Sequence, residues 1–199
     1  MISHSHKFIF IWIPKTGGSS IERVLYEYGL QKYGPSGKRN RRVFRPVRQR
    51  KVKKLRRIRE FREHWDGYFK FTFVRNPWDW LVSRYHSSRR RRLRYWAGKD
   101  EPFRRFVLDG GWRNRSFQQS FYDSIEFNGK IDVDFVGRTE TIEADFAHIC
   151  SKIGITAKLP HVNRNLARAA DYKSYYDDNL KGAVASIFSK DIKTFGFKW

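Results

Sequence analysis

The residues best suited to chemistry lie near the start of the chain, in the segment IPKTGGSS at positions 13–20. Lys15 brings a positive charge, the paired glycines let the backbone approach a ligand closely, and the paired serines offer hydroxyl donors. An apolar run precedes this segment and a helical pattern follows it. Backbone N–H groups at the start of a helix bind anions, because they lack partners within the helix and the helix dipole is positive there. The segment therefore predicts a phosphate-binding loop.

The order of residues in this loop argues against an ordinary ATP or GTP site. In nucleotide-hydrolysing proteins the loop reads G-x-x-x-x-G-K-[ST], with the lysine after the second glycine and a hydroxyl on magnesium. Here Lys15 precedes both glycines, which disfavours a small-molecule kinase. On the loop alone, a plain turn between strand and helix, with Lys15 as a surface charge, stays open.

A second pair of anion-binding side chains follows the expected strand at positions 68–74. Arg75 lies at the carboxyl end of this expected strand, Asn76 is the expected N-cap of a helix, and Ser83 lies on that helix. The carboxyl ends of parallel strands open on one crevice, so we expect Arg75 beside the Lys15 loop. A guanidinium and a hydroxyl can bind a phosphate. The two sites together predict a ligand with phosphates at both ends.

Three units of strand followed by helix are expected to position these residues. Residues 8–13 are apolar on both faces, as in a central parallel strand, and Ser19 is the expected N-cap of the next helix. The second strand is expected at 68–74, the third around 131–136, and a C-terminal helix at 176–192. This repeated pattern predicts an α/β fold, a P-loop-like three-layer domain with a central, mostly parallel sheet flanked by helices.

Composition sets the limits on organisation and partners. The 199 residues predict a single domain over 1–199, with basic insertions around 38–62 and 84–105. Against 20 Asp and Glu the chain has 42 Lys and Arg, a formal net charge of +22, which predicts anionic partners. The single cysteine, Cys150, supports neither a disulfide nor a metal site and is expected in the core. No apolar run of about 18 residues is present, so no membrane span and a cytoplasmic protein are expected.

Taken together, the motifs resemble those of a known family. IPKTGGSS, FKFTFVRNPWDWLVSRYH, DFVGRTETIEADF, LPHVNRN and the terminal DIKTFGFKW resemble the sulfotransferases that use 3′-phosphoadenosine 5′-phosphosulfate (PAPS), in particular their carbohydrate branch. The resemblance implies a P-loop-like α/β fold. It also implies transfer of a sulfuryl group from PAPS to a hydroxyl of a carbohydrate or glycoconjugate, with 3′-phosphoadenosine 5′-phosphate (PAP) as the product.

The resemblance also assigns roles to individual residues. Arg75 and Ser83 are implied to bind the 3′-phosphate. Arg138, in the motif GRTE, is implied as a further nucleotide contact, with a plain surface arginine as the alternative. Lys15 is the implied catalytic group that stabilises charge on the leaving phosphate. No metal is expected, because a sulfuryl group carries less negative charge than a phosphoryl group, so a lysine and backbone donors suffice. The loop implied to hold the 5′-phosphosulfate consists of Lys15, Thr16, Gly17, Gly18, Ser19 and Ser20.

The general base that takes the proton of the acceptor hydroxyl is less clearly marked. Members of the family usually place a histidine or glutamate between the phosphosulfate loop and the Arg-Asn-Pro corner, but here that interval is rich in arginine. His64, its only histidine, is the first candidate base, with an ordinary surface histidine beside Trp65 as the alternative. Glu60 and Glu63 are replacements, and His161 is a further possibility.

The basic tracts leave several readings of the partner open. Arginine-rich loops beside a donor cleft fit an anionic or neutral glycan acceptor, whereas a solvated surface is the plain alternative. A basic nucleic-acid-binding protein fits the charge and the interleaved aromatic residues. No recognition module is found for it, so nucleic acid is expected to bind only without specificity. A donor-binding homologue that has lost catalysis is the third reading. Nothing in the sequence indicates an oligomeric state.

Overall fold

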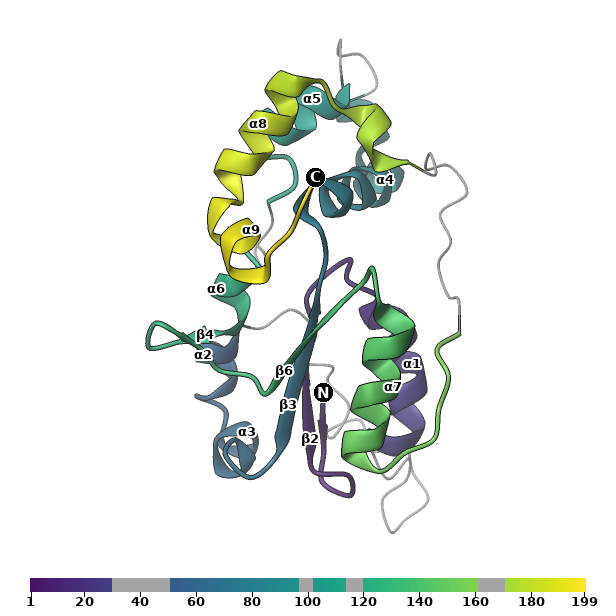
Figure 1. The fold of residues 1–199 in the computed structure, drawn as a ribbon, viewed down its shortest axis with the longest axis vertical. Helices are drawn as coiled ribbons and strands as arrows, with labels where there is room; N and C mark the ends of the chain where they lie inside the picture. Colours follow the sequence, from purple (N-terminus) through teal and green to yellow (C-terminus); the bar gives the residue numbers. More distant parts are fainter. Residues whose placement is uncertain (30–50, 97–101, 114–119, 161–170) are drawn as a thin grey trace. The chain divides into compact units, whose positions relative to one another are not determined.

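The computed structural model describes residues 1–29, 51–96, 102–113, 120–160 and 171–199 (Figure 1). The chain divides into two compact units, Met1–Val74 with Asp123–Asn163 and Arg75–Tyr122 with Arg164–Trp199. The expected single domain over 1–199 stays a prediction. Of the expected basic insertions, residues 38–50 and 97–101 lie outside the described residues.

A four-stranded sheet forms the centre of the first unit, in the order β1-β2-β3-β6. β3 pairs in parallel with β2 and with β6, and β1 joins β2 antiparallel. All four residues of β2 are buried, as expected for a strand covered by helices on both faces. The predicted α/β fold with a mostly parallel sheet is therefore confirmed. The strands are β1 (Ile2–Ser3), β2 (Phe8–Ile11), β3 (Phe69–Val74) and β6 (Phe135–Arg138).

The third strand lies later in the chain than predicted. We expected it around 131–136, but the sheet contains Phe135–Arg138. Lys130–Ile131 (β5) pairs instead with Glu126–Phe127 (β4) in a small hairpin. Asn128 and Gly129 make its turn with φ of 51° and 80°, the backbone that two-residue hairpin turns require. The hairpin uses Ile131, the first residue of the predicted segment, and the sheet strand begins four residues later at Phe135.

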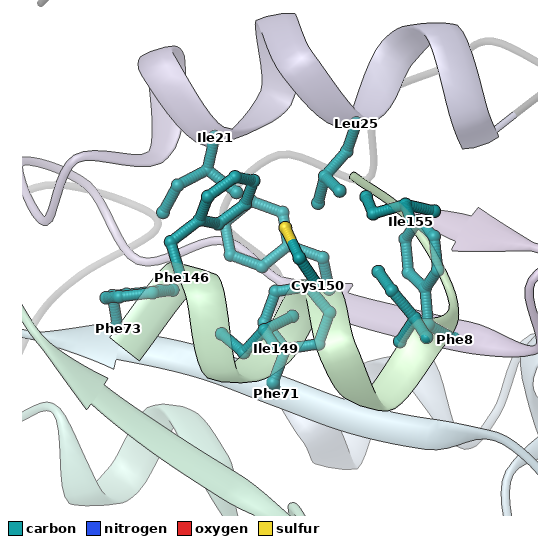
Figure 2. Close-up of a cluster of buried hydrophobic side chains, with 11 residues drawn as sticks. Phe8, Ile21, Leu25, Phe71, Phe73, Phe146, Ile149, Cys150 and Ile155 are labelled. Carbon is teal, nitrogen blue, oxygen red and sulfur yellow. The ribbon is translucent and has the colours of Figure 1, made fainter. Parts of the chain in front are cut away.

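Two helices, α1 (Gly18–Gly29) and α7 (Ile142–Ile153), pack over one face of this sheet (Figure 2). Their apolar sides enclose a buried cluster with the strand residues that point the same way. Cys150 belongs to this cluster, as expected, and burial raises the pKa of its thiol. The cluster consists of Phe8, Phe10, Ile21, Leu25, Phe71, Phe73, Phe146, Ile149, Cys150, Ile153 and Ile155.

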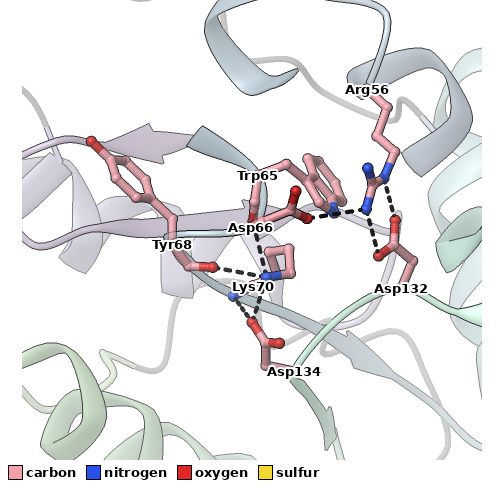
Figure 3. A network of polar contacts seen from close by, with 7 residues as sticks. All are labelled: Arg56, Trp65, Asp66, Tyr68, Lys70, Asp132 and Asp134. Atoms are coloured by element: carbon pink, nitrogen blue, oxygen red, sulfur yellow. Dashed lines mark hydrogen bonds and ion pairs between the residues drawn. The ribbon is translucent and has the colours of Figure 1, made fainter. Parts of the chain in front are cut away.

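On the other side of the strands lie α2 (Val52–Leu55) and α3 (Arg59–His64) (Figure 1). Arg56, between them, binds Asp132 through Nε and Nη2 at 2.6 and 3.1 Å, and its guanidinium lies 5.1 Å from the centre of the Trp65 ring (Figure 3). Lys70, on β3, is buried and its Nζ lies 2.9 Å from a carboxylate oxygen of Asp134. Arg56, in the first basic tract, and Lys70, outside it, therefore use their positive charge to hold the fold together.

The second unit is helical around an aromatic core. Trp80, Trp112, Phe121 and Phe188 pack against one another in its centre. The buried Asp191 supports this core, because its carboxylate accepts hydrogen bonds from two backbone N–H groups at 3.1 and 2.8 Å. The helices with residues in this unit are α4 (Pro77–Trp96), α5 (Pro102–Leu108), α6 (Tyr122–Ile125), η1 (Tyr172–Tyr175), α8 (Asp178–Ile187) and α9 (Ser189–Phe195).

The predicted C-terminal helix over 176–192 is in fact two helices, α8 and α9, separated at Phe188, whose ψ of 22° departs from helical geometry. The predicted start of α4 is confirmed, because Asn76 Oδ1 accepts from the Trp78 N–H at 3.2 Å and Pro77 is the first helical residue. Across the described ranges, no helix is both long and apolar enough to cross a membrane.

Candidate donor-binding site

The loop after β2 is a tight turn held by its own side chains. Thr16 is fully buried and its Oγ1 donates to the Ile13 carbonyl at 2.9 Å. Lys15 adopts a left-handed backbone with φ of 68°, and Gly17 follows at φ of 80°. A left-handed conformation costs a residue with a side chain about 1–2 kcal/mol, so the rest of the fold must hold Lys15 in place. The conformation of the loop is therefore fixed by a buried hydrogen bond and by two left-handed residues.

The two glycines are required because neighbouring side chains occupy the space that a Cβ would need. A Cβ on Gly17 would lie 2.3 Å from Cδ1 of Ile142, and a Cβ on Gly18 would lie 2.1 Å from Nε1 of Trp12. The sequence did not identify Trp12 and Ile142 as parts of the loop. Paired glycines signal that something approaches closely, but the identity of the approaching residue depends on tertiary packing.

Two helices begin at this loop. α1 starts at Gly18, one residue before the expected cap Ser19, because the N–H groups of Ser20 and Ile21 already bond to the Gly17 carbonyl at 2.9 and 3.2 Å. α7 starts at Ile142, the residue in contact with Gly17. The amino ends of helices carry partial positive charge. The half-buried Lys15 adds a full one, so this end of the unit is suited to an anion.

Arg138 lies on the same edge of the sheet as the loop. Ile11 pairs with Thr72 and Val74 with Arg138, which puts the carboxyl ends of β2, β3 and β6 together. The Arg138 side chain is exposed, and its backbone N–H donates to Asp145 at 2.7 Å. The first unit thus brings Arg138 to the edge where the loop lies.

Arg75 and Ser83 belong to the second unit, although Arg75 follows Val74 directly in the chain. The Arg75 Nε donates to Asp79 Oδ2 at 2.6 Å, and both side chains are largely buried. Ser83 is half-buried one turn further along α4. The three side chains follow one another at spacings of four residues, which places Asp79 and Ser83 on one face of the helix. This unit therefore holds the Arg75 guanidinium against Asp79, and the Ser83 hydroxyl lies one turn further along α4.

His64 lies away from the loop. It ends α3 just before β3, and the first residue of β3, Phe69, pairs with Phe8 at the start of β2, whereas Lys15 follows the end of β2 (Figure 1). The His64 ring stacks on Tyr68 with ring centres 4.8 Å apart. The structure therefore places His64 at the opposite end of the parallel strands from Lys15, in an aromatic contact.

The carboxylates named as replacements share the position of His64, because Glu60 and Glu63 are on the same helix, α3. Glu63 accepts a hydrogen bond from Arg59 Nε at 2.7 Å, and this bond lowers the pKa of its carboxyl. A lower pKa makes a weaker base. Glu60 lies 3.5 Å from His4 Nε2. His161 lies outside the described residues.

In the part of the chain that the structure describes, no group of three or more His, Cys, Asp or Glu side chains is arranged to hold a metal ion. The positive charge at the candidate site is supplied by side chains and helix ends. The expected absence of a metal stays a prediction.

Comparison with known proteins gives the family. The model of the sulfotransferase family matches residues 1–198. An uncharacterized protein of Archaeoglobus fulgidus is 34% identical over 116 residues, which cover 54% of this chain and 85% of that protein. The structure of mouse sulfotransferase SULT7A1 complexed with PAP is similar in fold, with a TM-score of 0.59 and 13% identity over 97% of this chain and 87% of that one. Since the family model spans nearly the whole sequence, the chain belongs to the sulfotransferase family.

Proposed function

We propose that this protein transfers a sulfuryl group from PAPS to an acceptor hydroxyl, and that Lys15 is its catalytic cation. The family match over residues 1–198 carries the proposal. The geometry of the loop supports it, since Lys15 lies on a tight turn that leads into α1 and contacts the first residue of α7. When the bond between sulfur and the 5′-phosphate oxygen breaks, negative charge grows on that oxygen. Lys15 and the backbone N–H groups of the loop stabilise this charge.

The proposed donor contacts follow the two ends of PAPS. Residues 15–20 bind the 5′-phosphosulfate, and Arg75 with Ser83 binds the 3′-phosphate. The paired serines are accessible enough to donate hydroxyls, with Ser19 exposed and Ser20 half-buried. Arg138 is proposed as a further nucleotide contact because it is exposed at the same sheet edge as the loop.

The first experiment compares the binding of PAP, adenosine 5′-phosphate, ATP and duplex DNA at two salt concentrations. A sulfotransferase binds PAP saturably and prefers it to adenosine 5′-phosphate, because only PAP carries the 3′-phosphate. A basic nucleic-acid-binding protein instead binds DNA with a steep salt dependence and shows no such preference. Absence of the preference for PAP would overturn the proposal.

The second experiment measures transfer of labelled sulfate from PAPS by the Lys15→Met variant. Methionine keeps the length of the side chain and removes its charge. Removing one preorganised donor to a developing oxyanion costs about 10²–10³ in turnover, so a loss of that size is expected. Lys152→Ala is the matched control, because Lys152 is an exposed lysine at the far end of α7. Unchanged turnover in Lys15→Met would remove Lys15 from the mechanism.

The proposed acceptor is a hydroxyl of a carbohydrate or glycoconjugate, as the resemblance to the carbohydrate branch implies. A screen of labelled sulfate transfer onto soluble glycans, glycolipid precursors and small alcohols tests this proposal. A donor-binding homologue without catalysis is the alternative, and it is supported by the distance along the strands between Lys15 and His64, the first candidate base. Such a homologue binds PAP with the expected preference and transfers no label to any acceptor.

A further inference from the structure

At the amino end of α4, Arg75 forms an ion pair with Asp79, a residue that has no role in the proposed function so far. Arg75 Nε donates to Asp79 Oδ2 at 2.6 Å, and the two side chains are only 14% and 16% exposed. This short distance is typical of a charge-assisted hydrogen bond. Asp79 lies one helical turn before Ser83 and one turn's spacing after Arg75. In the sequence, Asp79 therefore lies midway between Arg75 and Ser83, the two residues proposed to bind a phosphate.

A lone carboxylate at that position would oppose phosphate binding by charge repulsion. When Asp79 is paired with Arg75, the negative charge of its carboxylate is largely compensated. The hydrogen bond between the two side chains then serves to orient the guanidinium. A guanidinium is planar, with one donor on Nε and four on the two Nη atoms, so a bond at Nε fixes the plane in which the Nη donors lie. Ordering a long side chain opposes ligand binding. In this protein the ordering is already done by Asp79.

We propose that Asp79 is a positioning residue that holds the Arg75 guanidinium in the orientation that binds the 3′-phosphate of the donor. This inference rests on the proposed function and adds a residue to it. Asp79 acts through Arg75 and makes no bond to the nucleotide. Its removal therefore weakens only the ligand that carries a 3′-phosphate.

The test measures the affinities of PAP and adenosine 5′-phosphate by calorimetry. In Asp79→Ala the preference for PAP over adenosine 5′-phosphate is expected to fall about tenfold, the effect of losing about 1.4 kcal/mol, while the affinity for adenosine 5′-phosphate stays the same. Asp79→Asn keeps an oxygen that accepts from Nε and is expected to keep the preference within about threefold. Asp178→Ala, which removes an exposed carboxylate from the first turn of α8, is the matched control and keeps both affinities.

A double-mutant cycle keeps the inference testable if Asp79→Ala folds poorly. Lysine has no Nε–H donor with this geometry, so Arg75→Lys breaks the bond from the other side. Asp79→Leu, which keeps the volume of the side chain but accepts no hydrogen bond, should lower the preference for PAP in wild type and have no further effect on it in the Arg75→Lys background. If wild type prefers PAP and Asp79→Ala keeps that preference in full, the positioning role is wrong while the proposed function stands. If wild type shows no preference, the proposed function itself fails.

Discussion

Replacing Gly17 by alanine tests whether the loop is held against α7 as the structure describes. The first cost is the backbone, because alanine at a φ of 80° loses about 1–2 kcal/mol. The second is a collision, since the new Cβ would lie 2.3 Å from Ile142 Cδ1, where ordinary contacts are about 3.5–4.0 Å. Moving Ile142 off its rotamer costs about 0.5–1.5 kcal/mol. The reduced freedom of the unfolded chain returns about 0.4–1 kcal/mol. The net expectation is a loss of about 2 kcal/mol in the free energy of unfolding.

Gly129 provides a matched control for the backbone cost. Its φ is also 80°, but a Cβ there would meet no atom within 4 Å. Gly129→Ala should therefore show the backbone effect alone, and the difference between the two variants measures the collision. Ile142→Val removes the colliding Cδ1 and by itself costs about 0.5–1.5 kcal/mol. In the Gly17→Ala background, Ile142→Val should lower the free energy of unfolding by less than this or should raise it. In the Gly129→Ala background, Ile142→Val should lower it by the full amount.

Urea unfolding followed by circular dichroism measures these differences, provided that the slope against denaturant is unchanged among the variants. PAP affinity is measured in parallel, because a displaced loop is expected to bind the 5′-phosphate of PAP more weakly and so to lower the affinity at least about tenfold, equivalent to about 1.4 kcal/mol. The reasoning is refuted if Gly17→Ala and Gly129→Ala have the same stability and Ile142→Val costs the same in both. That result would mean that Gly17 and Ile142 are not in contact.

Two further predictions concern Cys150 and Asn76. Burial raises the pKa of Cys150, so above the ordinary thiol pKa of about 8.5 the unfolded state loses its proton first and stability falls as pH rises. In Cys150→Ala the free energy of unfolding should fall less than in wild type between pH 7.5 and 9.5. An identical pH dependence in the two proteins would contradict the prediction. A thiol reagent should react with wild type only after unfolding. Asn76→Ala should destabilise by about 2 kcal/mol, since it removes the cap of α4 and the 2.8 Å bond from Nδ2 to the Lys198 carbonyl. Asn76→Asp keeps the cap, so its free energy of unfolding, measured in urea, should fall by about half as much. If Asn76→Asp and Asn76→Ala lose the same amount, the cap does not stabilise the protein.

The elements that local rules specify were predictable from the sequence. The run at 8–11 is apolar throughout and is a buried parallel strand. Asn76 before Pro77 marks the start of α4, because an amide cap and a proline without an N–H both suit the first turn of a helix. The hairpin at 126–131 was missed, although Asn128-Gly129 is a strong turn signal, because the apolar residues around it also fit a longer strand.

The candidate site was predictable only in part, for two different physical reasons. The sequence identifies the glycines of the loop but not Trp12 and Ile142, which contact them through tertiary packing. The position of His64 follows from a simpler rule. A residue just before a parallel strand lies at the amino end of the sheet, and a loop just after one lies at the carboxyl end. Over the six residues of β3 these ends are about 16 Å apart. Resemblance to the family makes His64 the first candidate base, and the order of elements places it at the other end of the strands from Lys15.

The basic residues of the chain do not all have the same role in the structure. Arg56 and Lys70 have carboxylate partners at 2.6 and 2.9 Å, so these cations contribute to the fold and little to the field that an outside anion meets. Lys15 differs in its position, because it stands where α1 and α7 begin and where the backbone is already fixed. A cation that is preorganised beside helix amino ends stabilises developing negative charge far more than a mobile surface lysine does. Charge content therefore predicts anionic partners in general, whereas the position of Lys15 in the loop beside the amino ends of α1 and α7 supports the proposal that this lysine contacts the donor.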